Sequence, residues 1–154
     1  MSGSRFDTSL AQVCDRLNAH GAKYVLVGAR ALQLWGSTRA TRDIDLLIPK
    51  DVANARHILS ALSELGAGLA REWLAEEIVQ KPVTVIGDAP RVDLMTVAWT
   101  VPYLDAAADA TDFEVEGVRI PVASIDHLIA SKRTGRLQDA ADIEVLREIK
   151  RLRR

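Results

Sequence analysis

The sequence has very little cysteine: Cys14 is the only one among 154 residues. A single cysteine excludes an intramolecular disulfide and a zinc site built from several cysteines. Cys14 falls in helical step with Leu10, Val13 and Leu17, which predicts a buried, unreactive thiol. The three histidines are far apart in the sequence and lack the spacing of a metal site.

The sequence also lacks a long hydrophobic run and an excess of charge of one sign. No apolar stretch approaches the length of a membrane span, and the amino-terminal MSGSRFDTS has no signal-peptide hydrophobic region. The net charge is −1, with 48% hydrophobic and 27% charged residues, so the bulk charge does not indicate a nucleic-acid-binding protein. We therefore expect a cytoplasmic protein without membrane contact.

Apolar periodicity and turn residues predict a mixture of strands and helices. Strands are expected at 24–27, 43–48, 83–86 and 91–97, with a turn at 87–90 and a hairpin over 114–120 that turns at Glu116-Gly117. Helices are expected at 8–19, 29–35, 51–65, 101–110, 125–132 after the N-cap Ser124, and from 137 onward. Residues 67–81 show no readable pattern. The order predicts one α/β (α+β) domain over residues 1–154, with a mixed central sheet flanked by helices.

Two aspartates, Asp43 and Asp45, stand at the start of a predicted buried strand. Because side chains alternate along a strand, both leave the same face, roughly 6.6 Å apart. Two like charges at that distance raise each other's pKa unless a cation lies between them, and Mg²⁺ commonly takes one or two carboxylates together with substrate phosphates. A turn or capping role is the alternative, since Asp-x-Asp is a common tripeptide.

A third carboxylate, Asp93, lies within the predicted strand RVDLM. An unpaired charge among apolar neighbours is costly, so this position calls for a partner. If the two strands are adjacent, Asp93 can face Asp43 and Asp45, and three carboxylates could hold two metal ions. We therefore predict Asp43, Asp45 and Asp93 as the catalytic and metal-binding residues.

Gly28 lies between a predicted strand and a predicted helix, where backbone N–H groups form a ready anion site. The order strand, Gly28-Ala29, helix, Gly36, RATRDID at 39–45 and a later strand with Asp93 resembles the DNA polymerase β-like nucleotidyltransferase superfamily. The likeness is greatest to small bacterial nucleotidyltransferases related to abortive-infection toxins. The segment from Lys132 to Asp139, with its Arg-x-x-Asp, is also similar to theirs. The resemblance spans about residues 24–146.

This resemblance implies the nucleotidyltransferase fold and the transfer of a nucleoside monophosphate from a nucleoside triphosphate to a hydroxyl acceptor. An RNA end such as that of tRNA, or a protein, would be the acceptor, in a toxin-like setting. Mg²⁺, or alternatively Mn²⁺, would be the cofactor held by the three aspartates. The small size favours a homodimer or an antitoxin-like partner that completes the cleft. The residues placed at the nucleotide are Gly28, Ala29, Arg39, Thr41, Arg42 and Lys132.

One departure from the family pattern leaves alternatives open. The family often has a second Gly followed by Ser or Thr, where this sequence has Ala29 and Arg30. Arg30 could contact phosphate or lie on the solvent side of its helix. The alternatives are a catalytically inactive nucleotide-binding or interaction module of the same fold, and an enzyme that modifies a small antibiotic. Trp35 is the tryptophan placed best to stack on a base, although core packing is commoner. Asp139 is expected to pair with Arg136 or to cap the last helix.

Overall fold

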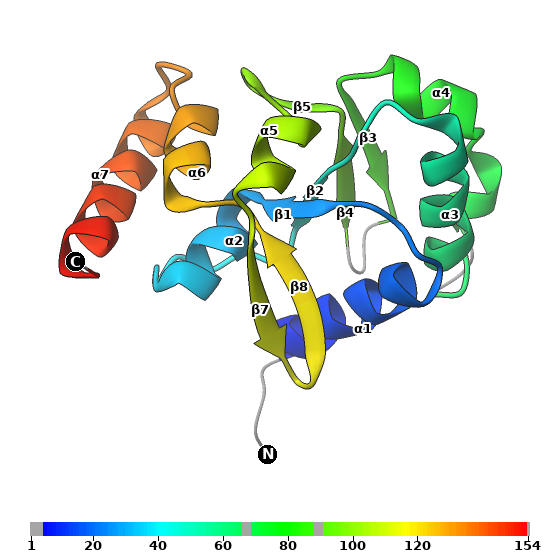
Figure 1. The fold of residues 1–154 in the computed structure, drawn as a ribbon, viewed down its shortest axis with the longest axis horizontal. Helices are drawn as coiled ribbons and strands as arrows, with labels where there is room; N and C mark the ends of the chain where they lie inside the picture. Colours follow the sequence, from blue (N-terminus) through cyan, green and yellow to red (C-terminus); the bar gives the residue numbers. More distant parts are fainter. Residues whose placement is uncertain (1–4, 66–68, 88–90, 154) are drawn as a thin grey trace.

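The structure is a computed structural model that describes residues 5–65, 69–87 and 91–153. A mixed six-stranded sheet has the order β3-β4-β2-β1-β8-β7 (Figure 1). β1 pairs antiparallel with β2 and parallel with β8, β2 and β4 are parallel, and β3–β4 and β7–β8 are antiparallel. The strands are β1 (Val25–Val27), β2 (Ile44–Leu47), β3 (Val83–Ile86), β4 (Val92–Met95), β7 (Thr111–Val115) and β8 (Val118–Val122).

Helices flank this sheet, as the sequence predicts. In Figure 1 the helices α6 and α7 lie together at one end of the molecule, and α3 and α4 lie at the other. Helical bounds are α1 (Arg5–Ala19), α2 (Gly28–Trp35), α3 (Val52–Leu62), α4 (Ala75–Gln80), α5 (Tyr103–Ala108), α6 (Ile125–Ser131) and α7 (Leu137–Leu152), with a 3₁₀ helix at Leu69–Glu72. The side chains of Asp51 and Ser124 cap α3 and α6. Within the described ranges, no helix is long and apolar enough to cross a membrane.

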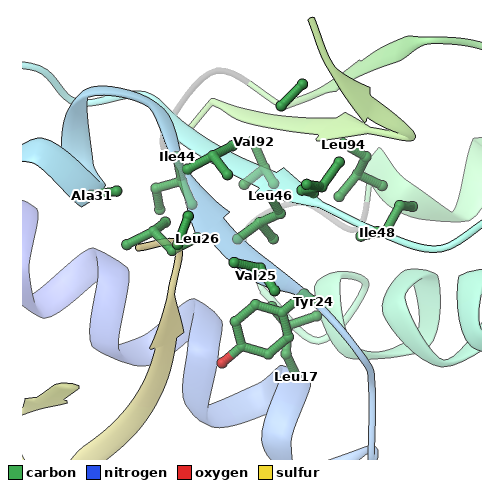
Figure 2. Packing of buried hydrophobic residues seen from close by; sticks show 14 of the residues in the cluster. Leu17, Tyr24, Val25, Leu26, Ala31, Ile44, Leu46, Ile48, Val92 and Leu94 are labelled. Carbon is green, nitrogen blue, oxygen red and sulfur yellow. The ribbon is translucent and has the colours of Figure 1, made fainter. Parts of the chain in front are cut away.

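Alternation along β2 and β4 separates a core face from a polar face of the sheet. Ile44 and Leu46 of β2 and Leu94 of β4 are buried and pack in one hydrophobic cluster with Leu26 and Leu17, close to α1 (Figure 2). Burying each such side chain stabilises the fold by about 1.5–3 kcal/mol. Because every second residue points the other way, the aspartates of these strands leave the opposite face.

The predicted hairpin at Glu116-Gly117 and the buried thiol are both confirmed. Glu116 and Gly117 have φ values of 50° and 80°, the left-handed backbone that a two-residue hairpin turn requires. The side chain of Cys14 is buried, and this burial raises the pKa of its thiol to about 12. Cys14 therefore stays a neutral thiol at physiological pH.

Two predicted elements differ from the structure. The strand expected at 91–97 is divided into β4 and a second short strand, β5 (Val97–Ala98). The helix expected from Val101 begins only at Tyr103, because Val101–Pro102 forms β6 and pairs with β5. A residue before proline is disfavoured in a helix, which explains the late start. Residues 88–90 of the turn predicted at 87–90, and residues 67–68 of the segment without a readable pattern, lie outside the described residues.

Candidate active site

The sheet register brings two of the three predicted aspartates side by side. Asp45 of β2 is the direct partner of Asp93 in the parallel β2–β4 pair, so their Cα atoms lie about 4.8 Å apart. Asp43 precedes β2 and its backbone N–H donates to the Thr41 hydroxyl at 3.2 Å. Its charge still acts on Asp45. Asp45 and Asp93 therefore form a carboxylate pair, with Asp43 at its edge.

The carboxylate pair is electrostatically unfavourable without a cation. Burial, followed by the neighbouring charges of Asp93 and Asp43 and a hydrogen bond with Asp93, raises the pKa of Asp45 to about 7. The positive charge of Lys132 opposes this shift but does not cancel it. A carboxyl with such a pKa is partly protonated near neutral pH, and a divalent cation can replace that proton.

Arg91 partly neutralises the carboxylate pair from the solvent side. Its guanidinium donates to both Asp93 oxygens, at 2.9 Å from Nε and 3.2 Å from Nη2. The side chain of Arg91 is 47% exposed, whereas that of Asp93 is only 13% exposed. Because the guanidinium is exposed, it can move away from Asp93 when another cation arrives.

Gly28 lies directly against the Asp45 carboxylate. Its φ is +71°, and a Cβ at this position would be 2.0 Å from Asp45 Oδ2 and 2.8 Å from Asp45 Cγ. Only glycine fits both the backbone conformation and this contact. Gly28 is also the first residue of α2, so the backbone at the start of this helix adjoins the carboxylate pair.

Across the cavity, Lys132 is held by two carboxylates of α7. Its Nζ lies 3.0 Å from Asp142 Oδ2 and 3.5 Å from Asp139 Oδ1. Arg39 also pairs with Asp142, and Arg136 Nε donates to Asp139 Oδ2 at 2.8 Å. The prediction that Asp139 pairs with Arg136 is therefore confirmed. Asp139 and Asp142 are themselves only 6% and 3% exposed.

The α7 carboxylates have the opposite electrostatics from the carboxylate pair on the sheet. Burial raises the pKa of Asp139, but the hydrogen bond from Thr134 and the charges of Lys132 and Arg136 outweigh burial and lower this pKa overall. Asp139 therefore stays ionised and holds Lys132 at the cavity. Asp142 receives a further hydrogen bond from Gln138 Nε2 at 3.1 Å.

A cavity of about 480 Å³ joins these groups. Volumes of 300–1,000 Å³ are typical of small-molecule and cofactor sites. Its charged lining residues are Asp45, Asp93, Lys132, Arg136 and Asp139, and Gly28 lies beside them. Its apolar lining comes from Val27, Pro82, Val83, Met95, Val97, Ala98 and Trp99. The lining thus combines charged groups, which suit an anionic ligand with a cation, and apolar groups, which suit a flat or apolar group.

Several predicted site residues lie elsewhere or act through the backbone. Arg42 is exposed, and neither it nor Thr41 is among the described residues that line the cavity. Ala29 is buried, so it can offer only its backbone to a ligand. Arg30 is 1% exposed, which contradicts the role considered for it on the solvent side of its helix, and it is not among the described residues that line the cavity.

The expectation that Trp35 is the tryptophan placed best for stacking is wrong. Its Nε1 donates to the Ala123 carbonyl at 2.9 Å, and its ring packs edge-on against Phe113 with centroids 5.0 Å apart. The Arg153 guanidinium lies 4.9 Å from the ring centroid. Trp35 is therefore a packing residue between α2, β7 and α7, and Trp99 lines the cavity instead.

Sequence reasoning missed Asp142 and Trp99. Asp142 follows Asp139 by three residues on a helix, a spacing that places both on one face and was a readable signal. Its partners Arg39 and Lys132 are remote in sequence, so the ion pairs themselves were not readable. Trp99 carries no local signal, because a tryptophan is unusual at the left-handed position it occupies.

The donor set of the carboxylate pair fits a hard divalent cation in part. Oxygen ligands are those that Mg²⁺ prefers, and it usually keeps substrate phosphates and waters as further ligands. Among the described residues, no group of three His, Cys, Asp or Glu side chains lies close enough to hold a metal ion. The chain therefore offers Asp45 and Asp93 as ligands, and Asp43 is not gathered with them.

Comparisons with known proteins agree with this geometry. The sequence model of a family described as "Nucleotidyl transferase of unknown function (DUF2204)" matches residues 6–154. An antigenic nucleotidyltransferase-like protein from Paracoccidioides brasiliensis is similar in structure, with a TM-score of 0.63 and 17% identity, over 99% of this chain and 78% of that one. A candidate nucleotidyltransferase from Thermotoga maritima has a TM-score of 0.60 and 20% identity, over 94% and 92%. No curated protein matches the sequence.

Proposed function

The chain belongs to this family of nucleotidyl transferases of unknown function, and we propose that it moves a nucleoside monophosphate from a nucleoside triphosphate to a hydroxyl acceptor. The observation that carries the proposal is the carboxylate pair, in which Asp45 and Asp93 are register partners beside Gly28. Lys132 lies on the same cavity. Together they combine a site for a divalent cation with a site for phosphate.

The chain's own groups divide the work of binding. Mg²⁺, or Mn²⁺, held by Asp45 and Asp93 would neutralise phosphate charge and favour loss of the acceptor's proton. Gly28 leaves room for the phosphates, because a side chain there would occupy the space beside the carboxylate. Lys132, oriented by Asp139 and Asp142, would contact the phosphate oxygens as a point charge. Catalysis would come from positioning and charge neutralisation.

An RNA end, such as that of tRNA, is the acceptor we propose, in a toxin-like setting. A second hollow of about 620 Å³ lies against α6 and α7 and is lined by Arg133, Arg147, Lys150 and Arg151. Three of these cations have acidic partners on their own helix or on α6, which reduces their pull on a polyanion. Phosphate contacts of this kind would give RNA binding that weakens steeply with salt.

Transfer of a labelled nucleoside monophosphate to total RNA or protein, in the presence of Mg²⁺, tests the proposal. We expect transfer by the wild type and at least a hundredfold loss in Asp45→Asn, because removing even an outer partner of a metal ligand costs roughly 10- to 100-fold. Asp105→Asn is the matched control, because Asp105 is an exposed aspartate on α5 that does not line the cavity.

Equal transfer by Asp45→Asn and the wild type would contradict the proposed role of the carboxylate pair. Metal-dependent nucleotide binding without transfer to any acceptor would favour the alternative, a binding module of the same fold. In that case the protein would bind the nucleotide in the cavity but would not transfer it to an acceptor. The label identifies the acceptor class, RNA or protein, by its sensitivity to ribonuclease or protease.

A further inference from the structure

The apolar wall of the cavity contains one exposed aromatic side chain. Trp99 lies in the two-residue loop Trp99-Thr100 between β5 and β6 and is 55% exposed. In Figure 1 this hairpin projects at the edge of the molecule between α6 and β3. Trp99 lines the same cavity as Lys132 and Asp45. Trp99 and the charged groups of the proposed phosphate and metal site therefore line one cavity.

The backbone of Trp99 is unfavourable for its side chain. Its φ is +58°, a left-handed value that is a genuine outlier for a bulky residue. Glycine or asparagine usually occupies such a position in a two-residue hairpin loop. Strained residues of this kind persist where the surrounding structure holds them, and they cluster at ligand-binding sites.

Core packing does not account for this tryptophan. Trp99 does not belong to the buried core of the described residues, whereas Trp35 and Trp73 both pack against it. The ring of Trp73 is also covered by Lys81, whose Nζ lies 4.9 Å from the ring centroid. Of the three tryptophans, Trp99 alone lines the cavity among the residues that the structure describes.

We propose that the indole of Trp99 stacks on the base of the bound nucleotide, with Val83, Met95 and Val97 completing the apolar base site. This inference rests on the proposed function, because it concerns the same ligand. The cavity is lined both by charged groups and by apolar groups, which are what the triphosphate and the base of a nucleoside triphosphate need. Aromatic stacking accepts every base, and the larger purines gain more contact than pyrimidines.

Titration of Mg·ATP and of Mg·tripolyphosphate, which has no base, tests the stacking. We expect Trp99→Gly to weaken Mg·ATP binding by about 5- to 150-fold, the range for loss of one base–aromatic stack. Mg·tripolyphosphate should bind the variant and the wild type alike. Trp99→Phe should retain most of the affinity. Leu104→Ala is the control, since Leu104 is 77% exposed on α5 outside the cavity.

The outcomes separate this inference from the proposed function. Glycine suits a φ of +58°, so Trp99→Gly should fold at least as stably as the wild type, which thermal unfolding checks. Unchanged Mg·ATP binding in folded Trp99→Gly would overturn the stacking and leave the proposed function standing. Wild-type binding of Mg·tripolyphosphate as tight as that of Mg·ATP would also overturn it. Binding of neither ligand by the wild type would overturn both proposals.

Discussion

Two sets of aspartates, one half-buried on the sheet and one buried on α7, lie near the same cavity and have opposite electrostatic surroundings. Asp45 and Asp93 lie side by side on β2 and β4, and burial together with like charge raises the pKa of Asp45 to about 7. Asp139 and Asp142 lie on α7 and are surrounded by positive charge, and the pKa of Asp139 falls below its ordinary value. In the first set, burial and then repulsion between like charges disfavour the ionised form of Asp45, and the second set holds a cation in place.

The difference shows that one residue type serves two purposes in one site. A carboxylate surrounded by hydrogen-bond donors is stable as an anion and orients its partners. A carboxylate beside another carboxylate is destabilising until a cation binds, and this stored repulsion favours the metal. Under the proposed function, the phosphate side of the cavity would be built into the fold and the metal side would be completed by the ligand.

The largest expected effect on stability comes from removing the cation of the α7 set. Lys132→Met leaves Asp139 and Asp142 buried with fewer partners, and breaking a buried ion pair typically costs about 3–5 kcal/mol. Arg136 and Arg39 remain, so we expect the lower end of that range in urea unfolding. Lys50→Met, at an exposed lysine, is the control.

A second substitution sharpens this prediction. Because Lys132→Met leaves excess negative charge at α7, adding Asp142→Asn should recover part of the lost stability. If Lys132→Met unfolds at the same urea concentration as the wild type, the ion pairs contribute nothing, and the contrast between the two sets of aspartates fails.

The positions of the aspartates on the sheet are largely predictable from the sequence, whereas the ion pairs of the aspartates on α7 are not. Alternation in β2 and β4 is readable from the sequence, and it places Asp45 and Asp93 opposite the apolar residues of their strands. The ion pair between Arg39 and Asp142 joins residues 103 positions apart, so no local pattern announces it. The order of strands β4-β2-β1 decides which carboxylates meet, and strand order depends on packing of the whole chain.

The short hairpin β5–β6 shows a different limit of sequence analysis. Its loop has tryptophan where the left-handed backbone normally indicates glycine or asparagine, so the usual hairpin signal is absent. Pro102 was the one sign in the sequence that the helix begins after residue 101, because the residue before proline is disfavoured in a helix. Local rules fail most often where a site needs an unfavourable residue, and Trp99 is such a case if it stacks on the base as proposed.

The second largest effect on stability is expected at Gly28, which lies against the carboxylate of Asp45. Gly28→Ala adds a Cβ 2.0 Å from Asp45 Oδ2 at a φ of +71°, so the carboxylate must move. We expect a loss of about 2–3 kcal/mol in unfolding free energy, from the left-handed backbone and the clash together. Mg²⁺-dependent nucleotide binding should fall as well.

Gly21→Ala separates backbone strain from the clash. Gly21 has a φ of +66°, and no atom lies within 4 Å of an added Cβ. This control should cost only the roughly 1–2 kcal/mol of the left-handed conformation and leave nucleotide binding intact. Equal effects of the two substitutions would show that Gly28 serves only the turn.

A smaller effect should appear in the pH dependence of stability without metal. A carboxyl whose pKa is raised by folding holds its proton more tightly in the folded state, so stability falls as pH rises from about 4 to about 7. Asp45→Asn lacks this penalty and should gain stability relative to the wild type across that window, with the full gain reached above pH 7. Thermal unfolding at pH 4 and 8 measures the difference. A constant difference at both pH values would mean that Asp45 titrates normally.

The smallest effect is expected at Arg91, the arginine that pairs with Asp93 in the sheet set of aspartates. Its guanidinium donates to both Asp93 oxygens and competes with any metal for them. Exposed ion pairs are weak, so Arg91→Gln should raise Mg²⁺ affinity by no more than about fivefold, measured by calorimetry without nucleotide. The unfolding free energy should hardly change. Arg56→Gln, at an exposed arginine paired with Glu76, provides the matched control and should leave Mg²⁺ affinity unchanged. Weaker Mg²⁺ binding in Arg91→Gln would mean that Arg91 orients Asp93 for the metal, much as Asp139 and Asp142 hold Lys132 in place.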